Sequence, residues 1–332
     1  MSRRTTSTVR LLAAALPLTL LAACSAGSSS ASPTTSPTPT ATFAPVTVDN
    51  CGTEVTVTTP PQRVVTIKSS TTEMLLALGL GDRIVGRAFP DGPFPDDLAA
   101  AGDAVPLISD KVPGQEALLA VQPDFVYAGW ESNFSADGVG DRSTLAGLGI
   151  GTYVSPAACK EAGSMPDPLT FDLVFDEIRE AGAIFGVPAA AEEVVAAEQA
   201  TLASVTKPSG TTTALWYSSG SDSPYVGAGI GAPEMIMDAA GLTNVFASVH
   251  DTWASVGWED VVAADPDVIV LVDASWNTAE HKIATLEANP ATAQLTAVQQ
   301  HRYLTVPFAA TEAGVRNADA VASLADQLTA LP

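Results

Sequence analysis

Apolar positions along the chain fall into short continuous runs that alternate with helical patterns. The runs VVTI at 64–67 and VIVLV at 268–272 contain almost no polar residue. Uniformly apolar runs of this length are typical of parallel strands that are covered on both faces. The order strand, helix, strand, helix, strand occurs in each half of the chain. We therefore expect an α/β protein with two Rossmann-like lobes, each built on a parallel sheet.

Two pairs of segments match across the halves and support this division. TEMLLALGLGDRIVG, starting at Thr72, matches PEMIMDAAGLTNVFA, starting at Pro233. GQEALLAVQPDFVYAGW, starting at Gly114, matches GWEDVVAADPDVIVLVD, starting at Gly257. Each match runs from a helix through a turn into a strand. Chance similarity among segments rich in Ala, Val and Gly is the alternative, but two matches in the same order favour a repeated unit.

A helical segment joins the two halves. Residues 170–207 have helical periodicity on both sides of Pro188, and a proline suits the first turn of a helix. The second helix, expected from Ala189 to about Val205, is long enough to bridge two lobes. The predicted organisation is an N-terminal lobe at 46–187, a bridging helix at 188–207 and a C-terminal lobe at 208–332. A helical bridge predicts limited opening of the ligand cleft between the lobes.

The first 45 residues have the pattern of an export signal and a tether. Three arginines precede a short apolar segment that ends in Leu-Ala-Ala-Cys24, which is typical of a lipoprotein signal peptide at 1–23 with lipidation on Cys24. Ordinary cleavage beside a chance cysteine is the alternative. Residues 24–45 are rich in Ser, Thr, Pro and Ala and indicate a disordered tether. The expected location is the outer face of a bacterial cytoplasmic membrane.

The charge of the chain excludes several classes of partner. The full chain carries a net charge of −22, and removal of 1–23 leaves 12 basic and 37 acidic residues, a net charge of −25. Binding to nucleic acid or to an anionic membrane through bulk charge is therefore not expected. We expect a monomer with an acidic surface, in which a local cation stands out.

Two cysteines remain after the signal peptide. In an oxidising exported environment, Cys51 and Cys159 are expected to form one disulfide within the N-terminal lobe. The spacing of the cysteines and of the three histidines does not make a metal site. The glycines of YVGAGIG lack the spacing of a dinucleotide-binding or phosphate-binding loop, so no cofactor is expected.

Candidate ligand-binding residues follow from the strand pattern. In parallel α/β lobes, ligands bind at the carboxyl ends of the strands, in the loops that lead into helices. These loops contain all five tryptophans, two tyrosines and a few cations. The candidates are Lys68, Ser69, Ser70, Thr71, Arg87, Trp130, Glu131, Trp216, Tyr217, Ser218, Ser219, Tyr225, Trp253, Trp276, Asn277 and Arg316.

The aromatic and cationic candidates indicate the chemistry of the ligand. Several loop aromatics together suggest a pocket for a large, flat or sugar-like ligand, although any one tryptophan can be a packing residue. Lys68 precedes a helix start, where free backbone N–H groups favour an anion. A phosphate or carboxylate on the ligand would fit this position. The alternative for Lys68 is a solvated surface charge.

No catalytic motif accompanies these residues. The sequence has no G-x-S-x-G nucleophile elbow and no histidine-rich metal motif. Ser218 and Ser219 lack an evident histidine partner, although a triad assembled in space is not visible in a sequence. We therefore expect a binding protein and not an enzyme. An extracellular enzyme and a surface sensor on the same scaffold are the other classes considered.

With these features in place, the chain resembles the class III solute-binding lipoproteins of ABC importers, the family that binds iron-siderophores and cobalamin. The resemblance rests on RVVTIKSSTTEMLLALGLGDRIVG and on the strands PDFVYAG and DPDVIVL, and it covers about residue 47 to the C-terminus. It implies an ABC permease and its ATPase as partners. It also implies that one acid on each lobe docks onto the permease, here Glu73 and Glu234. A capping box formed by Ser70 and Glu73 is the alternative for Glu73.

A narrower resemblance concerns the ligand. The segments YAGWESN, YVSPAACKE and AATEAGVRN look like those of a subgroup proposed to bind a deazaflavin coenzyme precursor that lacks the glutamate tail. Such a ligand has a flat tricyclic ring, a ribityl chain and a phospholactate. Ferric siderophores and corrinoids are the alternatives, and the sequence offers no obvious axial histidine for a corrinoid.

Overall fold

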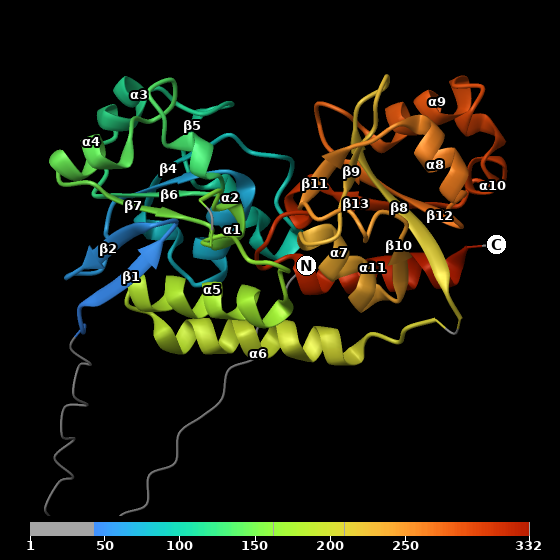
Figure 1. Ribbon diagram of the computed structural model, residues 1–332. Coiled ribbons are helices and arrows are strands. Elements are labelled where there is room, and N and C mark those ends of the chain that lie inside the picture. Colours follow the sequence, from blue (N-terminus) through green and yellow to red (C-terminus); the bar gives the residue numbers. More distant parts are fainter. Residues whose placement is uncertain (1–42, 162, 209, 332) are drawn as a thin grey trace, which may run out of the picture. The chain divides into compact units, whose positions relative to one another are not determined.

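The computed structural model describes residues 43–161, 163–208 and 210–331 (Figure 1). Residues from Phe43 onward form one unit. The signal peptide, Cys24 and the tether up to residue 42 lie outside the described residues. Across the described ranges, no helix combines the length and the apolar character that a membrane crossing requires.

The N-terminal lobe is built on a parallel five-stranded sheet. Its strand order is β5-β4-β3-β6-β7, and every neighbouring pair is parallel. The central strand β3 and its neighbour β6 are buried along their whole length, as expected for uniformly apolar runs. The strands of this sheet are β3 (Val64–Ile67), β4 (Ile84–Ala88), β5 (Leu107–Ser109), β6 (Phe125–Ala128) and β7 (Gly151–Val154).

The C-terminal lobe contains a mixed six-stranded sheet, which differs in part from the all-parallel sheet expected. Its strand β8 pairs in parallel with β10 and β12, and β12 pairs in parallel with β13. The short strands β9 and β11 add an antiparallel edge; they are three residues long and carry no long apolar run. The strands are β8 (Thr212–Ser219), β9 (Tyr225–Gly227), β10 (Leu242–Asn244), β11 (Trp253–Ser255), β12 (Val268–Asp273) and β13 (Tyr303–Pro307).

Helices cover both sheets, as the α/β pattern predicts. The described helices are α1 (Ser69–Ala77), α2 (Asp96–Asp103), α3 (Gln115–Ala120), α4 (Arg142–Gly147), α5 (Phe171–Ile184), α6 (Pro188–Ser204), α7 (Ala232–Ala240), α8 (Trp258–Ala264), α9 (Ala279–Ala288), α10 (Thr296–Gln299) and α11 (Asn317–Ala330). Short 3₁₀ turns are η1 (Gly81–Arg83), η2 (Glu131–Asn133), η3 (Pro156–Ala158), η4 (Thr292–Gln294) and η5 (Phe308–Ala310).

The internal sequence repeat corresponds to a repeated topology. The first matched pair becomes α1 followed by β4 and α7 followed by β10, and the second becomes α3 followed by β6 and α8 followed by β12. Both sheets therefore contain the same order of equivalent strands, β4-β3-β6-β7 in one lobe and β10-β8-β12-β13 in the other. The sequence matches thus mark equivalent positions in the two lobes.

The helix expected over 189–205 is α6, and it contacts both halves of the molecule. It packs against α5 and against the C-terminal helix α11, as Figure 1 also shows. From α6, Glu198 accepts a hydrogen bond from the backbone N–H of Ala318 at 3.3 Å, in the first turn of α11. Burial raises the pKa of Glu198 to about 8. This contact anchors the start of α11 to the bridging helix.

A hairpin absent from the sequence prediction precedes the N-terminal sheet. It consists of β1 (Val46–Asn50) and β2 (Thr53–Val57), which pair antiparallel. The expected disulfide is present and joins Cys51, in the hairpin turn, to Cys159, which follows η3. Arg142, at the start of α4, also links the hairpin to the lobe. It donates to the carbonyl of Asn50 at 2.7 Å and to the Asn50 side-chain oxygen at 2.9 Å.

Candidate functional site

A cavity of about 520 Å³ is lined by residues of both lobes. The volume is within the usual range for sites that bind small molecules and cofactors. Its walls are mostly apolar and include the aromatic rings of Trp130, Tyr225, Trp253, Trp276 and Phe308. We treat this cavity as the candidate ligand site.

The lining residues follow strand ends in both lobes, as the topology of parallel sheets predicts. Ser70 comes just after β3, Trp130 just after β6, and Ser155 directly after β7. The C-terminal lobe contributes the end of β8 and Phe308, which follows β13. Of the residues predicted from sequence, the structure brings together at this cavity Ser70, Trp130, Ser218, Ser219, Tyr225, Trp253 and Trp276.

The aromatic rings of the cavity are arranged in pairs. Tyr225 and Trp253 stack with ring centroids 5.9 Å apart and an interplanar angle of 13°. Trp276 meets Phe308 edge to face at 5.6 Å and is itself 57% exposed. A large exposed indole beside an apolar cavity leaves area that a ligand can cover. These rings therefore offer stacking surfaces from the C-terminal lobe, in addition to Trp130 of the N-terminal lobe.

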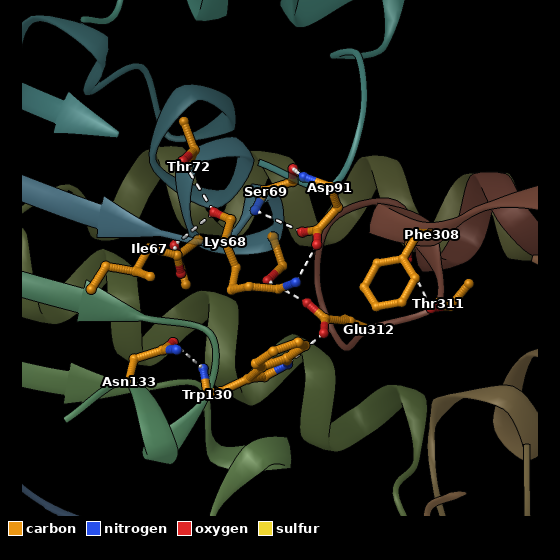
Figure 2. A network of polar contacts seen from close by, with 12 residues as sticks. Ile67, Lys68, Ser69, Thr72, Asp91, Trp130, Asn133, Phe308, Thr311 and Glu312 are labelled. Carbon is orange, nitrogen blue, oxygen red and sulfur yellow. Dashed lines mark hydrogen bonds and ion pairs between the residues drawn. The ribbon is translucent and has the colours of Figure 1, made fainter. Parts of the chain in front are cut away.

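Lys68 lies beside the lining residues Trp130, Phe308 and Glu312, in a cluster of rings and acids (Figure 2). Its side chain is 1% exposed and forms an ion pair with Asp91. The ammonium group is 3.8 Å from the ring centroid of Trp130, 4.4 Å from that of Phe89 and 4.8 Å from that of Phe308. A buried charge persists when it is paired and further contacts satisfy it. The charge of Lys68 is therefore balanced by Asp91 and by contacts with aromatic rings of its own chain.

The backbone conformation at Lys68 and its neighbours accommodates the buried side chain. Lys68 has φ = 87°, which an L-residue rarely adopts. Ser69 donates its backbone N–H to Asp91 at 3.1 Å, and its hydroxyl accepts from the Asp91 N–H at 2.8 Å. A Cβ on Gly129 would lie only 2.9 Å from the Lys68 side chain, so a glycine after β6 leaves room for it.

Lys68 is consequently not placed as an anion receptor, which corrects the expectation from sequence. It is not among the residues lining the cavity, and its charge is matched by Asp91. The alternative of a solvated surface charge is also wrong, because the side chain is buried. Asp91, which lies in the loop after β4, was not a candidate from sequence, since no local pattern distinguishes it from other loop acids.

Glu312 is a second acid that the sequence prediction missed. It lines the cavity and lies between η5 and α11, in the same segment as the predicted Arg316. Its Oε1 accepts from the indole N–H of Trp130 at 2.5 Å, and its Oε2 accepts from the Ser70 hydroxyl at 3.3 Å. Burial raises the pKa of Glu312 to about 7, although Lys68 acts in the opposite direction. A C-terminal-lobe carboxyl thus bonds two side chains of the N-terminal lobe.

Arg316 and Glu73 form a second contact between the lobes. Arg316 donates from Nε to Oε2 of Glu73 at 2.6 Å and from Nη2 to Oε1 at 2.5 Å. It also donates to the carbonyl of Pro93 at 2.9 Å. Burial raises the pKa of Glu73 to about 7, against the lowering effect of Arg316. Arg316 therefore binds an acid of its own chain and is not a lining residue of the cavity.

This arrangement differs from both expectations for Glu73. Its side chain is 1% exposed, and both carboxylate oxygens are bonded to Arg316, so it is not presented to a partner in this structure. The capping box is also not formed, because Lys68 is the residue that precedes α1 and makes no side-chain cap, and both Glu73 oxygens bond Arg316. The equivalent acid Glu234 is half-buried in the first turn of α7.

The remaining sequence candidates lie outside the cavity for identifiable reasons. Trp216 is 0% exposed because it lies mid-strand in β8 and faces the core. Arg87 packs over Phe94 and bonds the carbonyl of Val105. Thr71 donates to the carbonyl of Ile67 at 3.0 Å. Glu131 accepts from the backbone N–H of Lys160 at 2.6 Å.

Tyr217 and Asn277 line a separate, smaller cavity of about 340 Å³. Trp276 lines both cavities. The hydroxyl of Tyr217 is bonded to the carbonyl of Gly220 at 2.7 Å. Tyr217 and Asn277 therefore do not line the candidate site, and the two cavities share Trp276 as a lining residue.

Comparisons with known proteins agree with this arrangement. Residues 64–310 match the family described as "Periplasmic binding protein". The uncharacterized ABC transporter substrate-binding lipoprotein YvrC of Bacillus subtilis (strain 168) is 25% identical over 298 residues, covering 86% of this chain and 85% of that protein.

Solved structures are similar over nearly their whole length. A periplasmic binding protein from Veillonella parvula matches with a TM-score of 0.76 and 29% identity, covering 86% of this chain and 97% of that one. An ABC-type Fe3+-hydroxamate transport system structure from Saccharomonospora viridis matches with a TM-score of 0.72 and 27% identity, covering 85% and 98%.

The family match spans most of the chain, and the fold and the two-lobed cavity agree with it. Among the described residues, no group of three or more His, Cys, Asp and Glu side chains is placed to hold a metal ion. The chain belongs to the periplasmic binding protein family, as a substrate-binding protein of the ABC-transporter type rather than an enzyme.

Proposed function

We propose that this protein captures a flat aromatic ligand in the cavity between its lobes and delivers it to an ABC permease. The observation that supports this most is the set of rings that the two lobes direct at one mostly apolar cavity. Aromatic side chains bind flat ring systems by stacking and contribute large apolar contact areas. A ligand held between Trp130 and the C-terminal-lobe rings would contact both lobes at once.

The ligand proposed first is the deazaflavin coenzyme precursor that lacks the glutamate tail. Its tricyclic ring suits the aromatic walls, and the motifs that resemble the proposed deazaflavin-binding subgroup supply Trp130, Lys160 and Glu312 to the cavity. Lys160 is the one cation among the described lining residues and is exposed. It is available for an acidic group on the tail of the ligand.

A ferric hydroxamate is the second candidate. It is favoured by the similarity to the Fe3+-hydroxamate transport structure from Saccharomonospora viridis. A corrinoid is less well supported, because the cavity lining, among the described residues, includes no histidine that could serve as an axial ligand.

Binding to a panel of ligands tests the proposal. We expect the unlipidated Cys24→Ala chain to bind the deazaflavin precursor saturably, one to one, when heat is measured on titration. Trp130→Ala is expected to weaken binding about 10- to 100-fold, since stacking on one aromatic side chain contributes about 1–3 kcal/mol. Trp258→Phe is the matched control, because Trp258 packs in the core of the C-terminal lobe and does not line the cavity.

If only a ferric hydroxamate binds, the proposed deazaflavin ligand is wrong, and the proposed role as a substrate-binding protein of an ABC importer is retained. Equal losses in Trp130→Ala and Trp258→Phe would show that the cavity is not the site.

We further propose that lipidation on Cys24 anchors the chain to the membrane, as the lipoprotein relative suggests. Docking onto the permease would involve the acids at matching sequence positions of the two equivalent helices, Glu234 and, once its pair with Arg316 has opened, Glu73. Both the anchor and the docking remain predictions.

Glu234→Arg is expected to abolish ligand uptake by the native host while binding to the purified protein changes less than about twofold. Charge reversal converts attraction for permease cations into repulsion. Glu193→Arg, exposed on α6, is the control. Normal uptake by the Glu234 variant would contradict a docking role.

A further inference from the structure

The cavity wall has few acidic or basic residues, and they differ in solvent exposure. Among the described lining residues the only acidic or basic side chains are those of Lys160 and Glu312. Lys160 is exposed to solvent, whereas Glu312 is half-buried and accepts hydrogen bonds from Trp130 and Ser70. The strong polar feature inside the cavity is therefore an acceptor, and not the cation that the sequence suggested.

Glu312 has acceptor capacity that the hydrogen bonds from the described part of the chain do not use. A carboxylate offers about four lone-pair sites, and Glu312 receives one hydrogen bond from Trp130 and one from Ser70. Both bonds come from the N-terminal lobe and hold this C-terminal-lobe carboxyl group in place across the lobe boundary. An acceptor that is held in place and faces a largely apolar cavity discriminates strongly between ligands that can and cannot donate to it.

Lys68, the neighbouring cation, does not remove the preference of Glu312 for a hydrogen-bond donor. Lys68 is ion-paired with Asp91 and lies against the rings of Phe89, Trp130 and Phe308, of which Figure 2 shows the last two. If all three groups are ionised, the cluster of Lys68, Asp91 and Glu312 has an excess of one negative charge. A ligand anion placed here would be repelled, and a donor would be attracted.

We propose that Glu312 is the specificity-determining acceptor of the cavity and receives a hydrogen bond from an N–H group at the edge of the ligand ring. This inference rests on the proposed function and adds an orientation to it. A flavin-type ring carries an imide N–H that suits this role. The ring edge then faces Glu312, and an acidic tail lies where Lys160 can reach it.

A pair of ligands that differ at one atom tests the inference. The probes are the deazaflavin precursor and its analogue methylated at the imide nitrogen, titrated into the unlipidated Cys24→Ala chain. At about pH 8.5, above the pKa of about 7 to which burial raises Glu312, the wild-type cavity is expected to prefer the N–H form by about 10- to 100-fold, as for a hydrogen bond to a charged group. In Glu312→Gln the preference is expected to fall to about threefold or less.

The isosteric variant separates a hydrogen bond from a steric effect. A methyl group that merely clashes with the wall would do so equally in Glu312→Gln, whose amide oxygen still accepts from Trp130. Glu193→Gln, exposed on α6, is the charge-matched control and is expected to retain the full preference. Thermal melting of both variants checks that they are folded.

Three outcomes would overturn the inference. Equal binding of the two probes by the wild-type chain, or an unchanged preference in Glu312→Gln, would remove Glu312 as the acceptor and leave the proposed function intact. Failure of the wild-type chain to bind either probe would overturn the proposed ligand and, with it, the inference.

Discussion

Arg316→Met is expected to lower the free energy of unfolding by about 3–5 kcal/mol, the usual loss when one partner of a buried ion pair is removed. Arg316 bonds both oxygens of Glu73, whose side chain is 1% exposed and lies in the other lobe. The substitution leaves this carboxyl group buried without a cation. It also removes a contact between the lobes, so the cleft is expected to open more readily.

The loss should grow with pH. Arg316 lowers the pKa of Glu73, whereas burial, Asp91 and Asp97 raise it. Without Arg316 only the raising effects remain among these causes, so the folded-state pKa lies further above the unfolded value. A raised folded pKa gives stability that is present at acidic pH and is lost as pH rises through that pKa. Urea unfolding at pH 5.5 and pH 8 is expected to show the larger loss at pH 8.

Two further variants make this result specific. Glu73→Met combined with Arg316→Met removes both charges and should recover much of the stability, because no charge is left unpaired. Arg179→Met removes an arginine whose pairs with Asp176 and Glu192 lie at the surface, and should cost less than about 1 kcal/mol. Equal losses in the single and the double variant would contradict a paired role for Arg316.

Loss of the disulfide should have an effect of similar size. Cys51 and Cys159 are separated by 108 positions. By the chain-entropy model, closing a loop of about this length stabilises a protein by up to about 4.7 kcal/mol. The variant with Cys51→Ala and Cys159→Ala is therefore expected to lose about 2–5 kcal/mol in urea unfolding.

The position of the disulfide adds a functional consequence. Cys159 and Lys160 line the cavity, and the disulfide connects this segment to the hairpin turn. Ligand affinity is expected to fall as well, although Arg142 still ties the hairpin to the sheet. Wild-type protein unfolded in the presence of a reductant provides the comparison. Equal stability of the oxidised wild type and the double alanine variant would show that the bond contributes nothing.

The sequence by itself determined the α/β architecture of this protein. Continuous apolar runs predicted the buried strands of both sheets, because a strand covered on two faces holds few polar side chains, and one that is present, such as Thr66, needs a hydrogen-bond partner. The repeated segments marked equivalent strands in the two lobes, and the pattern on both sides of Pro188 marked α6. These features depend on residues that are close together in the chain, within about one helix or strand. A sequence therefore shows them directly.

Only the tertiary structure decided which polar residues face the ligand. Glu73 and Arg316 are 243 positions apart, and Trp130 and Glu312 are 182 apart, so no local pattern links them. Trp130 lines the cavity, whereas Trp216 is buried within a strand, although both were loop candidates. The sequence predicted Lys68, Arg87 and Arg316 as ligand-binding cations, but none of them lines the cavity, and Lys68 and Arg316 are paired with acids of their own chain. The pairing of charges is set by three-dimensional proximity and desolvation, and neither is written in residue order.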